Sequence, residues 1–303
     1  YTLILVNGRR VNSRDALTSN YSNDFDLSSI PLAAVDRIEV VRGPMSSIYG
    51  ADALGGVVNI ILKKPSEQLE TAFNYSYELP TEGDDGAIHK ASAYIGGSLI
   101  ENKLLANLVL EGVDQQAWRS EQSIYKNTDA AEKRKGFSIL SNVSWLINDN
   151  QTLDVDLTHR SDDRKAVWNN YGLSFPTNIQ EMDRTSVGLT YSANWNDINS
   201  RLRYYYENVD LMDNSEIITN LYKKTGDIQQ INHTVDAQLS GHIGEQHLVT
   251  GGAEFRKTEL EHNQNLNGSA SVNQTAFYLQ DEWKLDRLAL TFAGRFDDYD
   301  SFG

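Results

Sequence analysis

The stretch DRIEVVRGPMSSIYGADALGGVVNIILKK, residues 36–64, decides the fold of the N-terminal part of this chain. Two short apolar segments, 37–41 and 57–62, are predicted to be strands, and a turn region rich in glycine and serine separates them. Gly43-Pro44 ends the first strand because proline cannot donate to a strand ladder. Pro44 then suits the first turn of a short helix over 45–49. The stretch predicts a compact α/β element without a catalytic side chain, which an ordinary soluble domain could also contain.

The same stretch closely resembles the second half of the plug domain of TonB-dependent outer-membrane receptors. That family commonly carries IERIEVxRGP, then YG, then GGVVNIxTK. The matching residues here are Arg37, Ile38, Glu39, Val40, Arg42, Gly43, Pro44, Tyr49, Gly50, Gly55, Gly56, Val57, Asn59 and Ile60. Leu62 stands where the family often has threonine. Upstream, LVNGRRVNSRDA (5–16) and NDFDLSSIP (23–31) are most similar to the catecholate-siderophore branch, the group of the colicin I receptor and the ferric enterobactin receptor.

The composition of the 303 residues restricts the possible classes of protein. A net charge of −15 argues against a non-specific nucleic-acid binder, because phosphate backbones recruit clustered lysine and arginine. The absence of cysteine excludes a disulfide framework, a thiolate metal site and a cysteine nucleophile. No stretch approaches the ~20 apolar residues of a membrane helix, which leaves a membrane-spanning β-barrel open. The chain has no initiator methionine or signal peptide, so we expect an internal part of a longer protein.

Residues 1–64 are expected to form the compact part of the chain. Residues 3–6 read as a buried strand, and Asn7-Gly8 is a turn signal. The polar residues 9–26 are expected to form an ordered loop, and Ile30-Pro31 to begin a brief helical turn. Lys63-Lys64-Pro65-Ser66 is a plausible linker.

From residue 69 onward, apolar and polar residues alternate with period 2. In residues 69–79 the odd positions are mostly apolar or aromatic and the even positions polar or small, and the pattern recurs over 153–158 and 185–195. Strands of about eleven residues with a tilt of ~45° span ~25 Å, the apolar band of a membrane barrel. The eleven predicted strands are 69–79, 89–98, 103–113, 136–147, 151–160, 184–195, 200–209, 228–240, 247–258, 274–284 and 287–298.

The connections between these strands alternate in length. Short turns are predicted near 99–102, 148–150, 196–199, 241–246 and 285–286, and longer polar loops near 80–88, 114–135, 161–183, 210–227 and 259–273. Outer-membrane barrels alternate in this way, whereas a soluble β-sandwich has no reason to do so. The family resemblance implies 22 strands in all. We therefore expect an α/β plug segment (residues 1–64, the C-terminal half of the plug) inside an antiparallel transmembrane β-barrel, of which residues 65–303 form the first half.

Two groups of candidate site residues follow. Glu39 and Arg42 flank the strand-to-helix turn, and the resemblance implies that such plug residues contact the barrel wall; the alternative is a solvated surface pair. Glu254 and Glu282 are candidate barrel partners. For the ligand, a ferric catecholate is a bulky aromatic anion, which suits guanidinium and aromatic groups. The candidate ligand-binding residues are Arg10, Arg14 and Tyr21 in the plug and Trp118, Arg119, Trp168 and Tyr171 in the long loops. Arg14 and Tyr21 could instead lie in a solvated loop, and the loop aromatics could anchor the barrel at the lipid headgroups or pack the loops.

The sequence carries no persuasive enzyme signal. The six histidines are scattered without ligand spacing, and no nucleophile elbow or phosphate loop is present. Residues 297–300, DDYD, resemble a calcium ligand set only loosely. We expect neither catalytic nor metal-binding residues and no resident cofactor, with iron entering only as part of a transported chelate.

The resemblance implies a receptor in the outer membrane of a Gram-negative bacterium that takes up an iron–siderophore complex, of the catecholate class. Its expected partners are the siderophore, outer-membrane lipid and TonB, which would act through an N-terminal segment outside this chain; a colicin is a further candidate partner. Three alternatives remain. One is the same fold with another cargo, namely cobalamin, haem, a sugar or another siderophore. The second is a passive porin, against which the plug segment argues. The third is a soluble β-rich enzyme.

Overall fold

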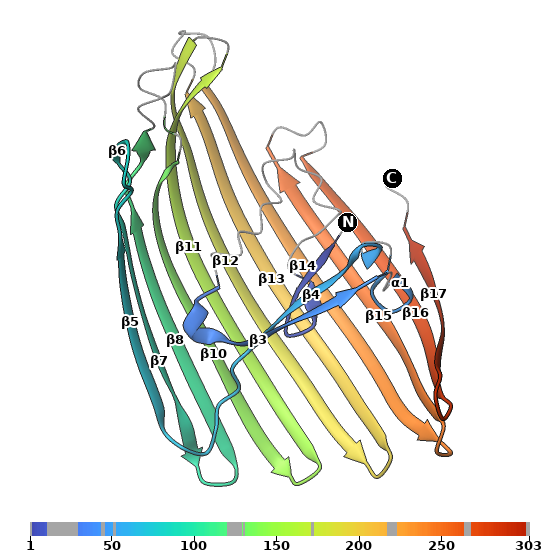
Figure 1. The fold of residues 1–303 in the computed structure, drawn as a ribbon. Coiled ribbons are helices and arrows are strands. Elements are labelled where there is room, and N and C mark those ends of the chain that lie inside the picture. Colours follow the sequence, from blue (N-terminus) through green and yellow to red (C-terminus); the bar gives the residue numbers. More distant parts are fainter. Residues whose placement is uncertain are drawn as a thin grey trace.

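The computed structural model describes residues 2–10, 30–43, 46–50, 53–119, 129, 131–170, 173–216, 223–263 and 268–300. They form a four-stranded sheet, the plug sheet, and an eleven-stranded antiparallel sheet, the wall (Figure 1). The plug sheet consists of β1 (Leu3–Val6), β2 (Arg9–Arg10), β3 (Val35–Arg42) and β4 (Gly56–Leu62), with the 3-10 helix η2 (Leu32–Ala34) and the helix α1 (Ser46–Tyr49) beside it. These elements confirm the predicted strand, helix and strand of the deciding stretch.

The plug sheet has the strand order β2-β1-β4-β3, with β1 parallel to β4. The predicted turn at Asn7-Gly8 joins β1 to β2, and both residues have positive φ, 51° and 73°, as a tight hairpin turn requires. The Asn7 side chain accepts a hydrogen bond from the Leu62 amide at 2.9 Å, and the Gly8 amide donates to Asn59 Oδ1 at 2.9 Å. The hairpin is thereby fixed to β4. The predicted loop over 9–26 was wrong for Arg9–Arg10, which pair with β1 as β2; residues 11–29 lie outside the described residues.

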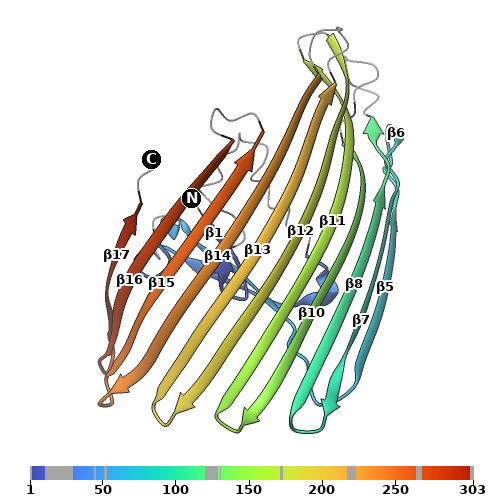
Figure 2. The same ribbon diagram turned by 180° about the vertical axis from the view of Figure 1, so that it is seen from behind.

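The wall confirms the eleven predicted strands and their antiparallel order along the chain. Its strands are β5 (Glu70–Glu78), β7 (Ile88–Ile100), β8 (Leu104–Gln115), β10 (Lys133–Asn148), β11 (Gln151–Asn170), β12 (Leu173–Trp195), β13 (Ile198–Glu216), β14 (Lys223–Ile243), β15 (His247–His262), β16 (Ser269–Lys284) and β17 (Ala289–Tyr299). Two short strands, β6 (Asp84–Asp85) and β9 (Trp118–Arg119), pair with each other apart from it. The wall curves around the plug sheet, which lies on its concave side (Figures 1 and 2).

The two faces of the wall differ as the alternation predicts. The convex face exposes large apolar side chains such as Phe73, 75% exposed, and Phe296, 65% exposed. The concave face buries polar groups, among them Asp154, Arg160 and Asp162. Where η2 contacts this face, Ala34, Tyr94, Val109 and Leu140 form a small buried apolar cluster. Among the described residues, no helix has the length and apolar character needed to cross a membrane.

The predicted long loops at 161–183 and 210–227 were largely wrong. Strand β11 continues to Asn170 and β12 begins at Leu173, while β13 continues to Glu216 and β14 begins at Lys223. Pairing between β11 and β12 runs without a break from Gln151↔Ala193 to Ala166↔Asn178. The apolar alternation marks only the part of each strand that is predicted to face lipid, whereas backbone pairing needs no apolar face and continues beyond it. The loops predicted at 114–135 and 259–273 are shortened in the same way by β10, β15 and β16.

Candidate functional site at the plug–wall interface

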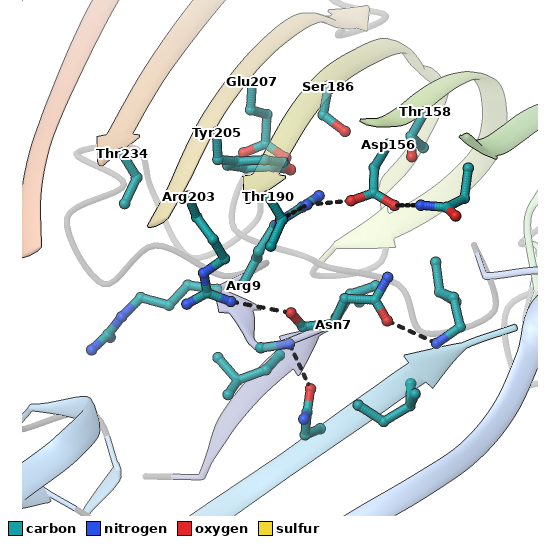
Figure 3. Close-up of a pocket in the computed structure, with 18 of the residues that line it drawn as sticks. Asn7, Arg9, Asp156, Thr158, Ser186, Thr190, Arg203, Tyr205, Glu207 and Thr234 are labelled. Atoms are coloured by element: carbon teal, nitrogen blue, oxygen red, sulfur yellow. Dashed lines mark hydrogen bonds and ion pairs between the residues drawn. The ribbon is translucent and has the colours of Figure 1, made fainter. Parts of the chain in front are cut away.

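A cavity of about 680 Å³ separates the plug sheet from the concave face of the wall (Figure 3). The plug contributes residues of the β1–β2 hairpin and β4, and the wall contributes inward-facing residues of β8 and of β10 to β16. Ten lining residues are cationic: Arg9, Arg10, Arg37, Lys63, Lys64, Arg160, Arg184, Arg201, Arg203 and Arg256. Six are acidic: Glu39, Asp154, Asp156, Glu207, Asp236 and Glu254. The cavity therefore carries an excess of four positive charges within a chain whose net charge is −15.

The Arg9 side chain extends from the plug into the wall. Its guanidinium pairs with the Asp156 carboxylate, donates to Thr190 Oγ1 at 3.3 Å and lies 5.2 Å from the centre of the Tyr205 ring (Figure 3). Gly188 makes room for it, because a Cβ at that position would overlap the guanidinium. The side chains of Arg9 and Asp156 are only 12% and 17% exposed. We call Asp156, Gly188, Thr190 and Tyr205 the Arg9 seat.

Two wall arginines bind plug carbonyl groups. Arg203 donates from Nη1 to the Asn7 carbonyl at 3.2 Å, and its Nε donates to both carboxylate oxygens of Asp236, at 3.0 and 2.8 Å. Arg295 donates from Nη1 to the Ile48 carbonyl at 2.8 Å. These contacts fix the hairpin turn and α1 to the wall, because a guanidinium held by a wall carboxylate has further donors to offer.

Arg295 is itself held by two wall carboxylates, Asp297 at 2.9 Å and Glu254 at 3.4 Å. On the plug side, Arg10 donates to the Tyr49 carbonyl. The last carbonyls of α1 thus have cationic partners, as the end of a helix favours. Arg10, which was predicted to bind ligand, lines the cavity and contacts α1; its contact with a ligand stays a prediction.

A third contact ties the segment after β4 to the same part of the wall. Lys64 pairs with Asp154 at 3.0 Å, and Asn107 Nδ2 donates to the Lys63 carbonyl at 2.7 Å. The Asn142 amide donates to Asn107 Oδ1 at 2.9 Å, and Asn142 Nδ2 donates to Asp156 at 2.8 Å. This chain of hydrogen bonds links the segment after β4 with the Arg9 seat.

The predicted plug contacts Glu39 and Arg42 occupy other positions. Glu39 accepts hydrogen bonds from Arg37 Nε at 2.9 Å and from Asn59 at 3.3 Å, both within the plug. Hydrogen bonds to Asp36 and Glu39 raise the pKa of the exposed Arg37. Arg42 is exposed at the end of β3, without an ion pair to any described residue. Their contact with the barrel stays a prediction.

Of the two candidate barrel partners, Glu254 lies on the cavity and pairs with Arg295. Glu282 accepts a hydrogen bond from Gln280 at 2.9 Å. Sequence reasoning missed Arg9 as the plug arginine that enters the wall. The signal available was its place directly after the Asn7-Gly8 turn, which folds Arg9 and Arg10 back as a strand beside β1.

The predicted ligand residues of the long loops have structural contacts where they are described. Trp118 Nε1 donates to the Glu82 carbonyl at 2.8 Å, and Arg119 Nε donates to Asp129 at 2.9 Å. The first contact joins the connection after β5 to the connection after β8, and the second lies within the connection after β8. Trp168 lies on β11. Its side chain, together with Arg14, Tyr21 and Tyr171, lies outside the described residues. Ligand contact by these residues stays a prediction.

A cationic cluster lies on the concave face beyond the Arg9 seat, toward the end of β11 at Asn170. The Asp162 side chain is fully buried and pairs with Arg134 at 2.8 Å, Arg160 at 2.8 Å and Arg164 at 2.9 Å. Arg164 also pairs with Glu132 at 3.1 Å. We call Asp162 and the three arginines the Asp162 cluster. Sequence analysis missed it because residues 161–164, SDDR, were assigned to a loop.

A plug sheet fixed by ion pairs to the inside of a curved antiparallel wall defines the class of plugged β-barrel receptors. Two family matches agree with this class: residues 1–57 match the TonB-dependent Receptor Plug Domain, and residues 122–303 match the TonB dependent receptor-like beta-barrel. The chain therefore belongs to the TonB-dependent receptor family, which is a family of receptors and not of enzymes. The predicted family and fold are confirmed.

Similar proteins and structures agree with that assignment. The chain is 28% identical over its whole length to the "Iron-regulated outer membrane virulence protein" of Vibrio cholerae, of which it covers 45%. It is 27% identical over 86% of its length to the "Ferric enterobactin receptor" of Pseudomonas aeruginosa, of which it covers 39%. The crystal structure of the siderophore receptor PirA from Acinetobacter baumannii has the same fold, with a TM-score of 0.81 at 21% identity over 98% of this chain and 49% of PirA. The chain spans less than half the length of these relatives.

Proposed function

We propose that the chain is part of an outer-membrane receptor that binds an anionic ferric siderophore of the catecholate class and releases it inward when TonB acts on the plug. The observation that carries this proposal is the charge of the plug–wall cavity, with ten cationic and six acidic lining residues in an acidic chain. A cationic lumen attracts an anionic chelate and repels a cationic one. The outer-membrane and enterobactin-receptor names of the relatives support the location and the cargo class.

The fold itself does not select the cargo. The crystal structure of the ferric citrate transporter FecA matches this chain with a TM-score of 0.77, close to the values for the siderophore receptors. The choice of a catecholate therefore rests on the names of the relatives and on the chemistry of the candidate ligand residues. Guanidinium groups suit the charge of a ferric catecholate, and aromatic side chains suit its rings.

The experiment is a binding comparison on the full-length receptor. Quenching of tryptophan fluorescence is measured with ferric catecholates, ferric hydroxamates, haem and cobalamin. We expect quenching by ferric catecholates alone, and selective binding of a different cargo would overturn the proposed substrate. Replacing Arg14 and Tyr21 together by alanine should weaken catecholate binding more than tenfold, about 1.4 kcal/mol. An unchanged affinity in that variant would move the site to other residues.

A second test concerns plug docking, which the family motif, and no contact among the described residues, assigns to Arg42. Arg42→Ala is expected to loosen plug docking and to increase the leakage of small solutes through the full-length receptor. Arg287→Ala, which removes an exposed arginine in the β16–β17 turn outside the cavity lining, is the control. Equal leakage in the two variants and the wild type would remove the role assigned to Arg42.

A further inference from the structure

The concave face of the wall carries one row of hydrogen-bond donors without a carboxylate. Register places Arg201 opposite Gln238, Gln238 opposite Gly252, and Gly252 opposite Tyr278, across β13, β14, β15 and β16. The side chains of Arg201, Gln238 and Tyr278 all line the cavity. Gly252 contributes no side chain, and the Tyr278 hydroxyl lies over it so closely that a Cβ there would overlap it. We call Arg201, Gln238 and Tyr278 the donor row.

Arg201 differs from its cationic neighbours because its charge is not neutralised by an ion pair. Among the described residues, its Nε has no hydrogen-bond partner and none of its nitrogens forms an ion pair. The charged and phenolic groups near it are Arg203, Asp236, Tyr278 and Tyr49. Asp236 is already engaged, since both its oxygens accept from Arg203 Nε. The Nε of Arg201 is buried and a guanidinium without an ion-pair partner is costly to hold partly away from water, so an anion that enters the cavity gains at this point.

The donor row lies nearer to the start of β13 than the Arg9 seat does, where a cargo that moves along the concave face would reach it last. Along β13, Arg201 comes three residues after the strand begins at Ile198, whereas Tyr205 of the Arg9 seat lies further toward the other end. Along the concave face the Asp162 cluster, the Arg9 seat and the donor row therefore follow one another.

We propose that the donor row is an internal anion site, where a carboxylate or catecholate oxygen of the cargo binds between plug and wall. The cargo's identity as an anion rests on the proposed function. A guanidinium, a carboxamide and a phenol together supply several N–H and O–H donors to one oxygen-rich group, and a hydrogen bond to a charged group is stronger than one between neutral groups.

A selenate soak tests the site directly. Crystals of the full-length receptor are soaked in selenate, and anomalous scattering locates the selenium. The expected result is a peak within hydrogen-bond distance of the Arg201 guanidinium and the Tyr278 hydroxyl, absent in Arg201→Gln. Tyr278→Phe, which keeps the ring over Gly252, should weaken the peak. The absence of a peak in the wild type would overturn the proposal.

Uptake measurements distinguish a site that acts in transport from one that binds an adventitious ion only. Arg201→Gln should lower the uptake of ferric catecholate about tenfold and leave its affinity at the outer surface unchanged. Arg201→Lys should retain most of the wild-type uptake. Arg287→Gln, in the exposed β16–β17 turn, is the control. A selenate peak with unchanged uptake in Arg201→Gln would mean an adventitious ion only. Increased sensitivity of cells to vancomycin, which reports leakage through the receptor, would mean that Arg201 holds the plug in the wall instead of binding cargo. Either result overturns the proposal. If the wild-type receptor failed to bind ferric catecholates, the proposed function would be overturned. The selenate peak would still decide whether the donor row binds an anion.

Discussion

Gly188→Ala should unseat Arg9 without deleting any charged group. The new methyl group would occupy the space of the Arg9 guanidinium, and a flexible arginine yields before the wall does. Breaking a buried ion pair costs about 3–5 kcal/mol. Two effects reduce this figure here, because Asp156 keeps its hydrogen bond from Asn142 and Arg9 can turn toward water in the cavity. We expect a loss of about 2–3 kcal/mol of plug docking free energy, including the contact with Tyr205.

Hydrogen exchange measures this loss in the full-length receptor. The Asn7 amide, which donates to the Ile60 carbonyl at 2.9 Å, and the Gly8 amide exchange when the hairpin opens. Their exchange should accelerate about 30- to 150-fold in Gly188→Ala. Arg9→Ala should have a similar effect, and the double variant should add little because both changes break the same contact. Gly112→Ala, where a Cβ meets nothing within 4 Å, is the control. Unchanged exchange in Gly188→Ala, or full additivity, would refute the role of the Arg9 seat.

Three further changes test other parts of the molecule. Asp162→Asn should lower stability by about 3 kcal/mol, because it removes the buried carboxylate that three arginines share. Thermal unfolding measures this loss, and Asp163→Asn, at an outward-facing position, should have little effect. Phe277→Arg should lower stability in lipid vesicles by about 2–4 kcal/mol, because it places an arginine on the lipid face. Gln280→Arg, on the concave face, should not. Equal urea midpoints for the two variants would contradict the assignment of the faces. Trp118→Phe should speed proteolysis of the connection over 79–87 because it removes the indole N–H, and unchanged cleavage would show that this hydrogen bond does not order the connection.

The sequence predicted the elements whose pattern is local. The strands of the wall were recognisable because their alternation follows from one face in lipid and one in the lumen, and the short turns carried their own asparagine and glycine signals. The plug strands and α1 were recognisable from the glycine and proline positions of the deciding stretch.

The site was less predictable because its contacts are long-range. The partners of Arg9 lie 147 and 181 residues away in the sequence, and nothing local to 9–10 distinguishes an arginine in the wall from one in solvent. Glu39 and Arg42 were chosen from the family motif, yet the plug carbonyls of Asn7 and Ile48 are what the wall arginines bind. Backbone acceptors leave no trace in a sequence motif, because every residue has one.

The continued pairing of β11 with β12 affects how a ligand meets the outer rim. The 23 residues of β12 have a contour of about 75 Å, and a tilt of ~45° gives a height of about 50 Å, roughly twice the ~25 Å lipid band. Much of this hairpin therefore stands clear of the lipid as backbone already fixed by ladder hydrogen bonds. Ordering a free backbone costs about 1–2 kcal/mol per residue, and here folding has met that cost before any ligand arrives. A molecule that docks on this part of the wall would meet a pre-organised backbone, so weaker individual contacts suffice for the same affinity.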